Sequence, residues 1–247
     1  MESQRLQLIA CEVFTRELCA AVAGSSNQVD LKFLPKGLHS LGCQRMRSAI
    51  QDCIDAVPEG RYDAICLGFG LCNNGLAELR AGHTPLVMPR AHDCITLFLG
   101  SRQRYREQFD NNPGTYFLTS GWIERGDTDE QLQPLSVEHQ TGLDLSYQDM
   151  VDKYGEDNAK FLYEQLNQTS NYGRYCYVEM GVEPDDRYQR ETQRRADDKG
   201  WRCDTVRGDM DLLQRLLNGP WDDDFITVAP GQRIAASYDD RVVEAKP

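Results

Sequence analysis

The chain has 247 residues, a net charge of −12 and a pI of about 4.8, and 40% of its residues are hydrophobic. This length allows one large domain or two small ones, with a true apolar core. The acidic charge repels phosphate backbones and argues against a nucleic-acid partner, and no apolar run approaches the roughly 20 residues that a membrane helix needs.

The first half of the chain alternates predicted strands with predicted helices. Residues 44–57 carry apolar side chains at helical spacing, whereas 62–69 is a short apolar run typical of a buried strand. Strands are predicted at 6–10, 29–34, 62–69, 85–88 and 114–118, and helices at 15–23, 44–57 and 95–109. This alternation predicts an α/β fold, a Rossmann-like three-layer sandwich with a mostly parallel sheet.

The second half begins with a polar, turn-rich connection at 124–141 and a predicted helix at 147–166. Strands are then predicted at 175–180, 202–206 and 224–228, helices at 186–199 and 210–217, and a charged tail from Ser237. We therefore divide the chain into an N-terminal α/β lobe (1–123), a connecting helical segment (124–172) and a C-terminal βαβαβ block with its tail (173–247). This block is either a second, related α/β lobe or an extension of the first sheet.

The nine cysteines give the strongest indication of chemistry. Residues 1–5 lack the basic start and the apolar segment of a signal peptide, so we expect a cytoplasmic protein. Disulfides are rare in that compartment, and an odd number of cysteines argues further against a closed disulfide framework. Buried, catalytic or metal-bound cysteines are therefore expected.

Cys11, Cys72 and Cys94 each lie at or just after the end of a predicted strand. Strand ends of one sense lie along one edge of a parallel sheet, where ligands bind. We therefore predict that these three thiols converge on a metal, either an iron–sulfur cluster such as [4Fe–4S] or a zinc ion. The alternative is that each is a small buried hydrophobic residue.

Cys72 follows a glycine-rich run, and Gly68, Gly70 and Asn73 are the predicted cofactor-binding residues around it. The run opens like Gly-x-Gly-x-x-Gly, but Asn73 replaces the third glycine and no acidic ribose partner follows at the usual distance. A dinucleotide site is therefore a poor interpretation. A tight turn that presents Cys72 to a ligand is a better one.

Cys94 stands at the start of the predicted helix at 95–109, after His92 and Asp93. The helix dipole is expected to lower the pKa of its thiol, which favours metal binding or nucleophilic attack. His92 and Asp93 are the predicted catalytic residues, as proton carriers beside the metal. In the simpler interpretation Asp93 only caps the helix and His92 is an exposed loop residue.

A fourth protein ligand is sought among His39, Cys43, His92 and Cys176. Trp122 and Tyr172 stand next to strand boundaries, where they either form the walls of a pocket or only pack. The chain contains no Cys-x-x-Cys, P-loop, Gly-x-Ser-x-Gly or His-Glu-x-x-His motif. Thioredoxin, phosphoryl-transfer, ester-hydrolase and zincin chemistry therefore lose most of their support.

Several segments together resemble a known family. They are residues 9–12, 38–39, 62–65, 68–73, 89–95, 99–101, 113–117 and 120–123, with the Gly-x-Gly-x-Cys and His-Asp-Cys patterns among them. This set resembles the DUF1638 family of uncharacterised prokaryotic proteins. The resemblance implies metal or one-carbon chemistry by association, because family members occur in settings of corrinoid-dependent methyl transfer. It adds a corrinoid to the candidate cofactors, and a methyltransferase or corrinoid protein to the candidate partners.

Three hypotheses follow. The first is a metal- or iron–sulfur-dependent protein that acts on a small-molecule substrate, as a lyase or a methyl transferase if it is an enzyme. The second is a non-catalytic accessory protein that carries a metal or corrinoid to a methyltransferase. The third is a cofactor-free enzyme with Cys94 as nucleophile. The substrate, the metal and the oligomeric state stay open at this level.

Overall fold

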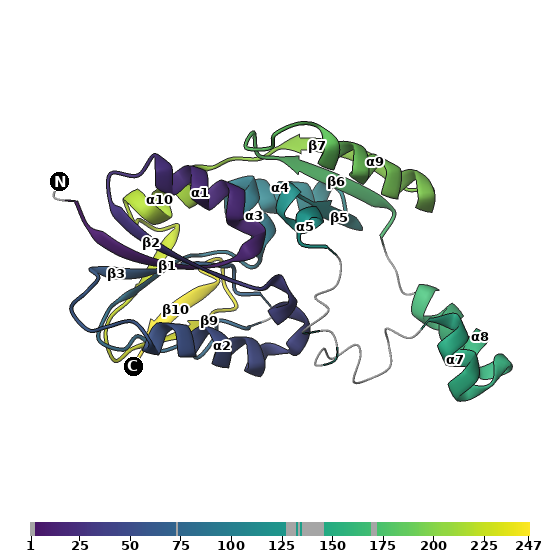
Figure 1. Ribbon diagram of the computed structural model, residues 1–247, viewed down its shortest axis with the longest axis horizontal. Coiled ribbons are helices and arrows are strands. Elements are labelled where there is room, and N and C mark those ends of the chain that lie inside the picture. Colours follow the sequence, from purple (N-terminus) through teal and green to yellow (C-terminus); the bar gives the residue numbers. More distant parts are fainter. Residues whose placement is uncertain (1–2, 73, 127–131, 133, 135–145, 169–171) are drawn as a thin grey trace.

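The computed structural model is a mixed α/β protein with two parallel-type sheets and several helices (Figure 1). It describes residues 3–72, 74–126, 132, 134, 146–168 and 172–247. Within these residues, no helix combines the length and the apolar character that crossing a bilayer requires.

The larger sheet has five strands in the order β2-β1-β3-β4-β8. The strands are β1 (Arg5–Cys11), β2 (Gln28–Leu34), β3 (Ala64–Gly68), β4 (Leu86–Pro89) and β8 (Phe225–Val228). The first four run parallel, and β8 pairs antiparallel with β4. Strands β3 and β4 are fully buried, as expected for a parallel sheet that is covered on both faces. The predicted parallel α/β fold is confirmed at this level.

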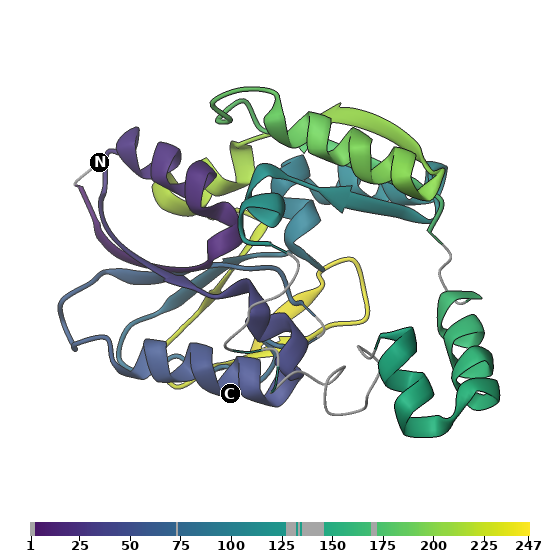
Figure 2. The same ribbon diagram turned by 45° about the vertical axis from the view of Figure 1, so that its right-hand side comes forward.

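Helices cover both faces of this sheet. Figures 1 and 2 show α1 (Thr15–Ala23) and α10 (Asp211–Asn218) on one face and α2 (Cys43–Asp55) on the other. The inward side of α10 is a row of four buried leucines, and α2 buries the apolar positions that defined its helical spacing. The buried residues are Leu212, Leu213, Leu216 and Leu217 in α10, and Met46, Ile50, Cys53 and Ile54 in α2.

The residues from Ser237, expected to form a charged tail, instead complete an antiparallel hairpin. It pairs β9 (Arg233–Ala236) with β10 (Val243–Lys246). Val242 and Val243 are both buried in the main core. Burial of these two valines holds the end of the chain against the protein, although charged residues surround them.

Two predicted helices are each broken in two by a glycine. The helix predicted at 95–109 is α3 (Cys94–Leu99) followed by α4 (Arg102–Asn111). The one predicted at 147–166 is α7 (Tyr147–Tyr154) followed by α8 (Glu156–Gln168). The residues between them, Gly100 and Gly155, have φ values of 77° and 79°. Glycine adopts this left-handed conformation at low cost, so it ends the helix.

The smaller sheet joins distant parts of the chain. Its order is β5-β6-β7, formed by β5 (Thr115–Leu118), β6 (Arg174–Glu179) and β7 (Arg202–Arg207), all parallel. Helix α9 (Arg187–Lys199) packs on it, and α5 (Ser120–Glu124) follows β5. Strand β5 precedes the boundary placed at residue 123, whereas β8 from the C-terminal block returns to the larger sheet. Both sheets therefore cross the boundaries suggested by the sequence.

Helices α7 and α8 pack against each other and stand apart from the two sheets in both views (Figures 1 and 2). Met150 in α7 and Ala159 in α8 are buried. The larger sheet, by contrast, shares one continuous hydrophobic core with Val178 in β6 and Met180 just after it. The carboxyl end of β6 therefore packs into the core of the larger sheet.

Candidate metal centre

The carboxyl ends of the four parallel strands bring the candidate ligands together. Cys11 is the last residue of β1, and His39 lies in a short 3-10 helix (Lys36–Leu41) after β2. Cys72 lies in the turn after β3, and Cys94 is the first residue of α3, after β4. The strand order reverses between β1 and β3, and such a switch point is where open α/β sheets bind their ligands.

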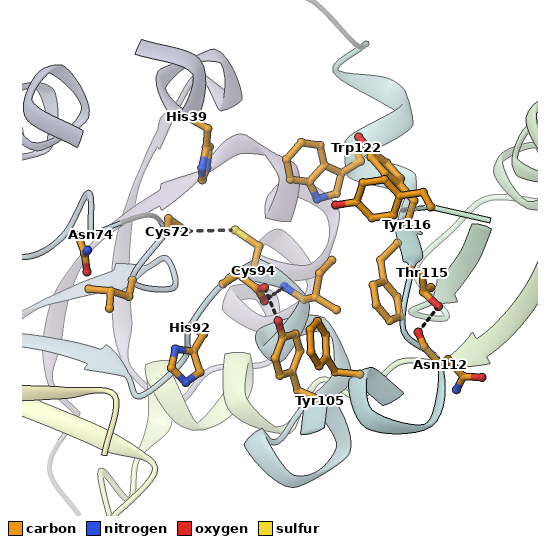
Figure 3. Close-up of a pocket in the computed structure, with 17 residues that line it drawn as sticks. His39, Cys72, Asn74, His92, Cys94, Tyr105, Asn112, Thr115, Tyr116 and Trp122 are labelled. Carbon is orange, nitrogen blue, oxygen red and sulfur yellow. Dashed lines mark hydrogen bonds between the residues drawn. The ribbon is translucent and has the colours of Figure 1, made fainter. Parts of the chain in front are cut away.

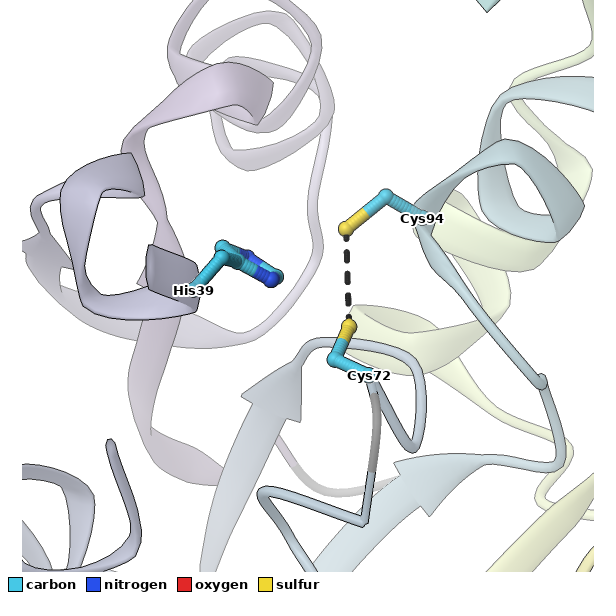
Figure 4. Close-up of side chains that lie close together, drawn as sticks. All are labelled: His39, Cys72 and Cys94. Atoms are coloured by element: carbon cyan, nitrogen blue, oxygen red, sulfur yellow. Dashed lines mark hydrogen bonds between the residues drawn. The ribbon is translucent and has the colours of Figure 1, made fainter. Parts of the chain in front are cut away.

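Two of the three predicted cysteines meet closely. The sulfurs of Cys72 and Cys94 are 3.8 Å apart (Figure 4). His39, Cys72 and Cys94 each offer a ligand atom within 4.8 Å of the other two. Cys11 is not a member of this group, but its sulfur lies 3.9 Å from His39 Nε2. His39, a candidate fourth ligand from the sequence, thus lies near both the predicted third thiol and the pair.

Backbone hydrogen bonds set the distance between the two sulfurs. The amide of Leu71 donates to Ala91 O at 2.8 Å, and the amide of Cys72 donates to His92 O at 3.0 Å. These bonds join the loop after β3 to the loop after β4. Cys72 itself has a φ of 46°, a left-handed conformation that costs a non-glycine residue roughly 1–2 kcal/mol. The surrounding loop thus holds this thiol in a strained position.

The predicted cofactor-binding glycines allow close packing of the backbone. A Cβ on Gly68 would lie 2.6 Å from Ala10 Cβ, and a Cβ on Gly70 would lie 2.6 Å from Asp93 Cα. Neither glycine lines the cavity described below. Gly70 lets the loop that carries Cys72 touch the backbone just before Cys94. Asn73 lies outside the described residues.

Asp93 caps α3. Its Oδ1 accepts hydrogen bonds from the amides of Ile95 and Thr96 at 3.0 and 3.3 Å, and its Oδ2 accepts one from the Tyr105 hydroxyl at 2.8 Å. The capping role that the sequence suggested is therefore confirmed. Burial, together with the Asp93 carboxylate, raises the pKa of Tyr105 well above its usual value. This carboxylate fixes the orientation of the helix whose first residue is Cys94.

The remaining candidate ligands lie outside the group. His92 is exposed and lines the cavity, but its ring points away from both sulfurs (Figure 3). Cys43 is exposed at the start of α2. Cys176 is buried in β6, where burial raises the pKa of its thiol to about 11. None of these three is a member of the group formed by His39, Cys72 and Cys94.

The expected lowering of the Cys94 thiol pKa is wrong. The hydrogen bond with Cys72 and complete burial raise this pKa well above its ordinary value. Burial and the neighbouring Cys94 likewise raise the pKa of Cys11. Helix α3 has only six residues, and its dipole does not offset the loss of water around the sulfur. Without a bound cation, Cys94 is therefore a neutral thiol and a poor nucleophile at pH 7.

A cavity of about 710 Å³ opens beside the cluster and lies within the usual size range of ligand pockets (Figure 3). His39, Cys72 and Cys94 form one part of its lining. Aromatic side chains form much of the rest, namely Tyr105, Phe109, Tyr116, Phe117, Trp122 and Tyr172. Trp122 and Tyr172, for which the sequence left open a place in a pocket wall or simple packing, both line the cavity. Tyr105, Phe109, Tyr116 and Phe117 could not be found from the sequence, because only the packing of α4 and β5 beside the larger sheet brings them there.

Comparisons with known proteins place the chain in one family. The family model described as "Protein of unknown function (DUF1638)" matches residues 33–217. Neither the curated proteins nor the solved structures contain a match. The matched region contains His39, Cys72 and Cys94 but begins after Cys11. Because the match covers most of the sequence, and spans the sheet edge that carries the cluster, the chain belongs to the DUF1638 family.

Proposed function

We propose that His39, Cys72 and Cys94 bind a single metal ion, zinc in the first instance. The sulfur–sulfur distance carries this proposal. Two thiolates at about 2.3 Å from one tetrahedral ion stand about 3.8 Å apart, and the sulfurs of Cys72 and Cys94 are 3.8 Å apart. An imidazole nitrogen completes a donor set of two thiolates and one histidine, which suits zinc.

A [4Fe–4S] cluster fits this spacing less well. Each thiolate of a cubane binds a different iron, so its ligand sulfurs must stand farther apart than two ligands of one ion. The loops around Cys72 and Cys94 are joined by backbone hydrogen bonds and have little freedom to separate. We therefore place a mononuclear site ahead of the iron–sulfur cluster.

The proposed site has an open side. Catalytic zinc sites keep three protein ligands and leave a fourth position for water or substrate. All three proposed ligands line the same cavity, which is large enough for a small organic molecule. We therefore propose a metal-dependent enzyme, in which the ion would act as a Lewis acid on an oxygen, nitrogen or sulfur atom of the substrate.

The protein residues around the site then have distinct roles. His92 lines the cavity and is exposed, so it can exchange protons between a bound ligand and water. Asp93 is a positioning residue, because both its oxygens are engaged by the amides of α3 and the Tyr105 hydroxyl. The strand order β2-β1-β3-β4 with parallel pairing supports the finer proposal that the larger sheet is Rossmann-like.

Metal analysis of variants tests the ligand set. Cys72→Ser, Cys94→Ser and His39→Ala should each lose most of the bound metal after anaerobic purification. Cys43→Ser, at an exposed position outside the cluster, is the matched control and should keep one ion per chain. Cys11→Ser should keep the metal as well. Unchanged metal content in the first three variants would refute the site, and loss in Cys11→Ser would make Cys11 a fourth ligand and close the open position.

The other hypotheses from the sequence predict different outcomes. An iron–sulfur protein would be brown, with iron and sulfide in equal amounts. An accessory protein would bind a corrinoid protein or methyltransferase tightly through the open position. An enzyme that uses Cys94 as a metal-free nucleophile would contain no metal and would lose its activity on Cys94→Ala.

A further inference from the structure

The aromatic part of the cavity carries a further inference about what the site binds. We infer that it takes an organic cation, a substrate with a quaternary or otherwise alkylated ammonium group. This deepens the proposed function and rests on it for the statement that the bound molecule lies beside the metal. The inference itself depends on the rings and charges around the cavity.

The rings come from α4, β5, α5 and the residues before β6, and they meet in one cavity. Tyr116 on β5 and Tyr172 before β6 stand edge to face, with ring centroids 5.4 Å apart. Tyr105 and Phe109 on α4 are stacked at 6.2 Å. Trp122 continues this wall toward the metal ligands, since its ring centroid lies 6.3 Å from that of His39 (Figure 3). The aromatic wall and the proposed metal site are therefore contiguous.

Three of these rings are open to solvent. Phe109 is 58% exposed, Tyr116 41% and Tyr172 48%. Large aromatic side chains that gather at the mouth of a cavity, rather than in the core, are typical of binding sites. Their π faces carry negative charge and attract cations, most strongly where water is excluded. Such rings are the usual means of recognising quaternary ammonium groups.

The charges around the cavity favour the same class of ligand. Among the described residues, no lysine or arginine lines it, whereas the carboxylate of Asp93 does. The nearby Lys36 is buried outside the lining, where its Nζ donates to Trp122 O at 3.3 Å and lies 5.0 Å from the centroid of the Trp122 ring. Trp122 therefore already has a cation beside it, and the rings that receive the ligand's cation are those of Tyr105, Phe109, Tyr116 and Tyr172. The net charge of −12 also attracts cations and repels anions. A phosphorylated substrate would find no fixed cation to pair with it among these lining residues.

Trp122 lines the cavity with its ring but not with its N–H group. Within the described part of the chain, its buried Nε1 has no hydrogen-bond partner. A buried N–H group without a partner is unusual in a native protein. This nitrogen is closed to solvent, so a ligand in the cavity does not reach it and Trp122 contributes its ring alone to the wall.

Choline and its neutral isostere test the inference directly. Choline and 3,3-dimethylbutan-1-ol share their shape and hydroxyl, and differ in that a positive nitrogen replaces a carbon. We expect isothermal titration calorimetry to give choline at least a tenfold lower Kd, as expected for a partly desolvated cation–π site. Equal or tighter binding of the neutral alcohol would refute the inference, and so would tighter binding of acetate or inorganic phosphate.

Variants separate this inference from the metal proposal. Tyr116→Leu and Tyr172→Leu should each weaken choline binding by about three- to tenfold while the metal content stays the same. Tyr238→Leu is the matched control, since Tyr238 is fully exposed and does not line the cavity. The metal-free His39→Ala variant should still bind choline. If the wild type holds no metal and choline still binds, only the metal proposal fails. If Tyr116→Leu and Tyr172→Leu both leave the affinity for choline unchanged, only the cation proposal fails.

Discussion

Adding one methyl group at Gly70 should loosen the whole candidate site. A Cβ at this position would lie 2.6 Å from the Cα and the carbonyl carbon of Asp93, and 2.8 Å from its nitrogen. These are backbone atoms, which cannot rotate away as a flexible side chain can. Gly70→Ala must therefore push the loop that carries Cys72 away from the loop that carries Cys94.

The size of the effect follows from that overlap. Ordinary contact begins at 3.4 Å, so the two loops must separate by about 0.8 Å. Overpacking of this kind costs about 1–3 kcal/mol, which lowers Tm by roughly 2–12 °C in a protein of this size. Because the ligand sulfurs move with their loops, metal affinity should fall by about 10- to 100-fold, as it does when supporting residues of metal sites are changed.

Thermal unfolding and competitive zinc titration measure the two effects. Gly82→Ala is the matched control, because a Cβ at Gly82 meets nothing within 4 Å. The control should match the wild type in both assays. If Gly70→Ala also matches the wild type in Tm and zinc affinity, then close packing at this glycine does not set the spacing of the site.

Three further predictions concern stability and reactivity. Burial raises the pKa of Glu17 from 4.5 to about 7, so the folded chain holds a proton that the unfolded chain releases. The unfolding free energy should therefore fall as pH rises from 4.5 to 7. Urea titrations should show that Glu17→Gln removes roughly 2–3 kcal/mol of the fall between pH 5 and 8. An unchanged pH dependence in this variant would contradict the prediction. Asp93→Ala should cost about 1 kcal/mol by removing a helix cap, and Asp93→Asn should cost less, in thermal unfolding; equal stability of Asp93→Ala and wild type would show that the cap contributes nothing. In metal-free native protein, iodoacetamide should label the exposed Cys19 and Cys43 and spare the buried Cys94, as mass spectrometry would show; labelling of all three at one rate would contradict the burial of Cys94.

Much of the architecture could be predicted because local patterns decide it. Short apolar runs and helical spacing located the strands of the larger sheet and helices such as α1 and α10. Helices α3 and α4 were predicted as one, because a glycine inside a helical pattern does not by itself end a helix. The pairing of β5 with β6 could not be predicted, since it joins residues that lie far apart in the chain.

The candidate site divides in the same way. Cys72 and Cys94 could be placed at one sheet edge, because residues after parallel strands must lie there. His39, and not Cys11, joins that pair in the group of candidate ligands. This depends on how the short helix after β2 packs, which no local pattern encodes. The direction of the Cys94 thiol pKa shift was wrong for a related reason, since burial depends on the whole fold and outweighs the local dipole.

X-ray absorption at the zinc edge tests the central claim most directly, on protein purified anaerobically and loaded with one equivalent of zinc. We expect two sulfur neighbours at about 2.3 Å and one imidazole nitrogen at about 2.0–2.1 Å, with a light atom in the fourth position. A first shell of oxygen and nitrogen alone would contradict it, and so would protein that binds no zinc.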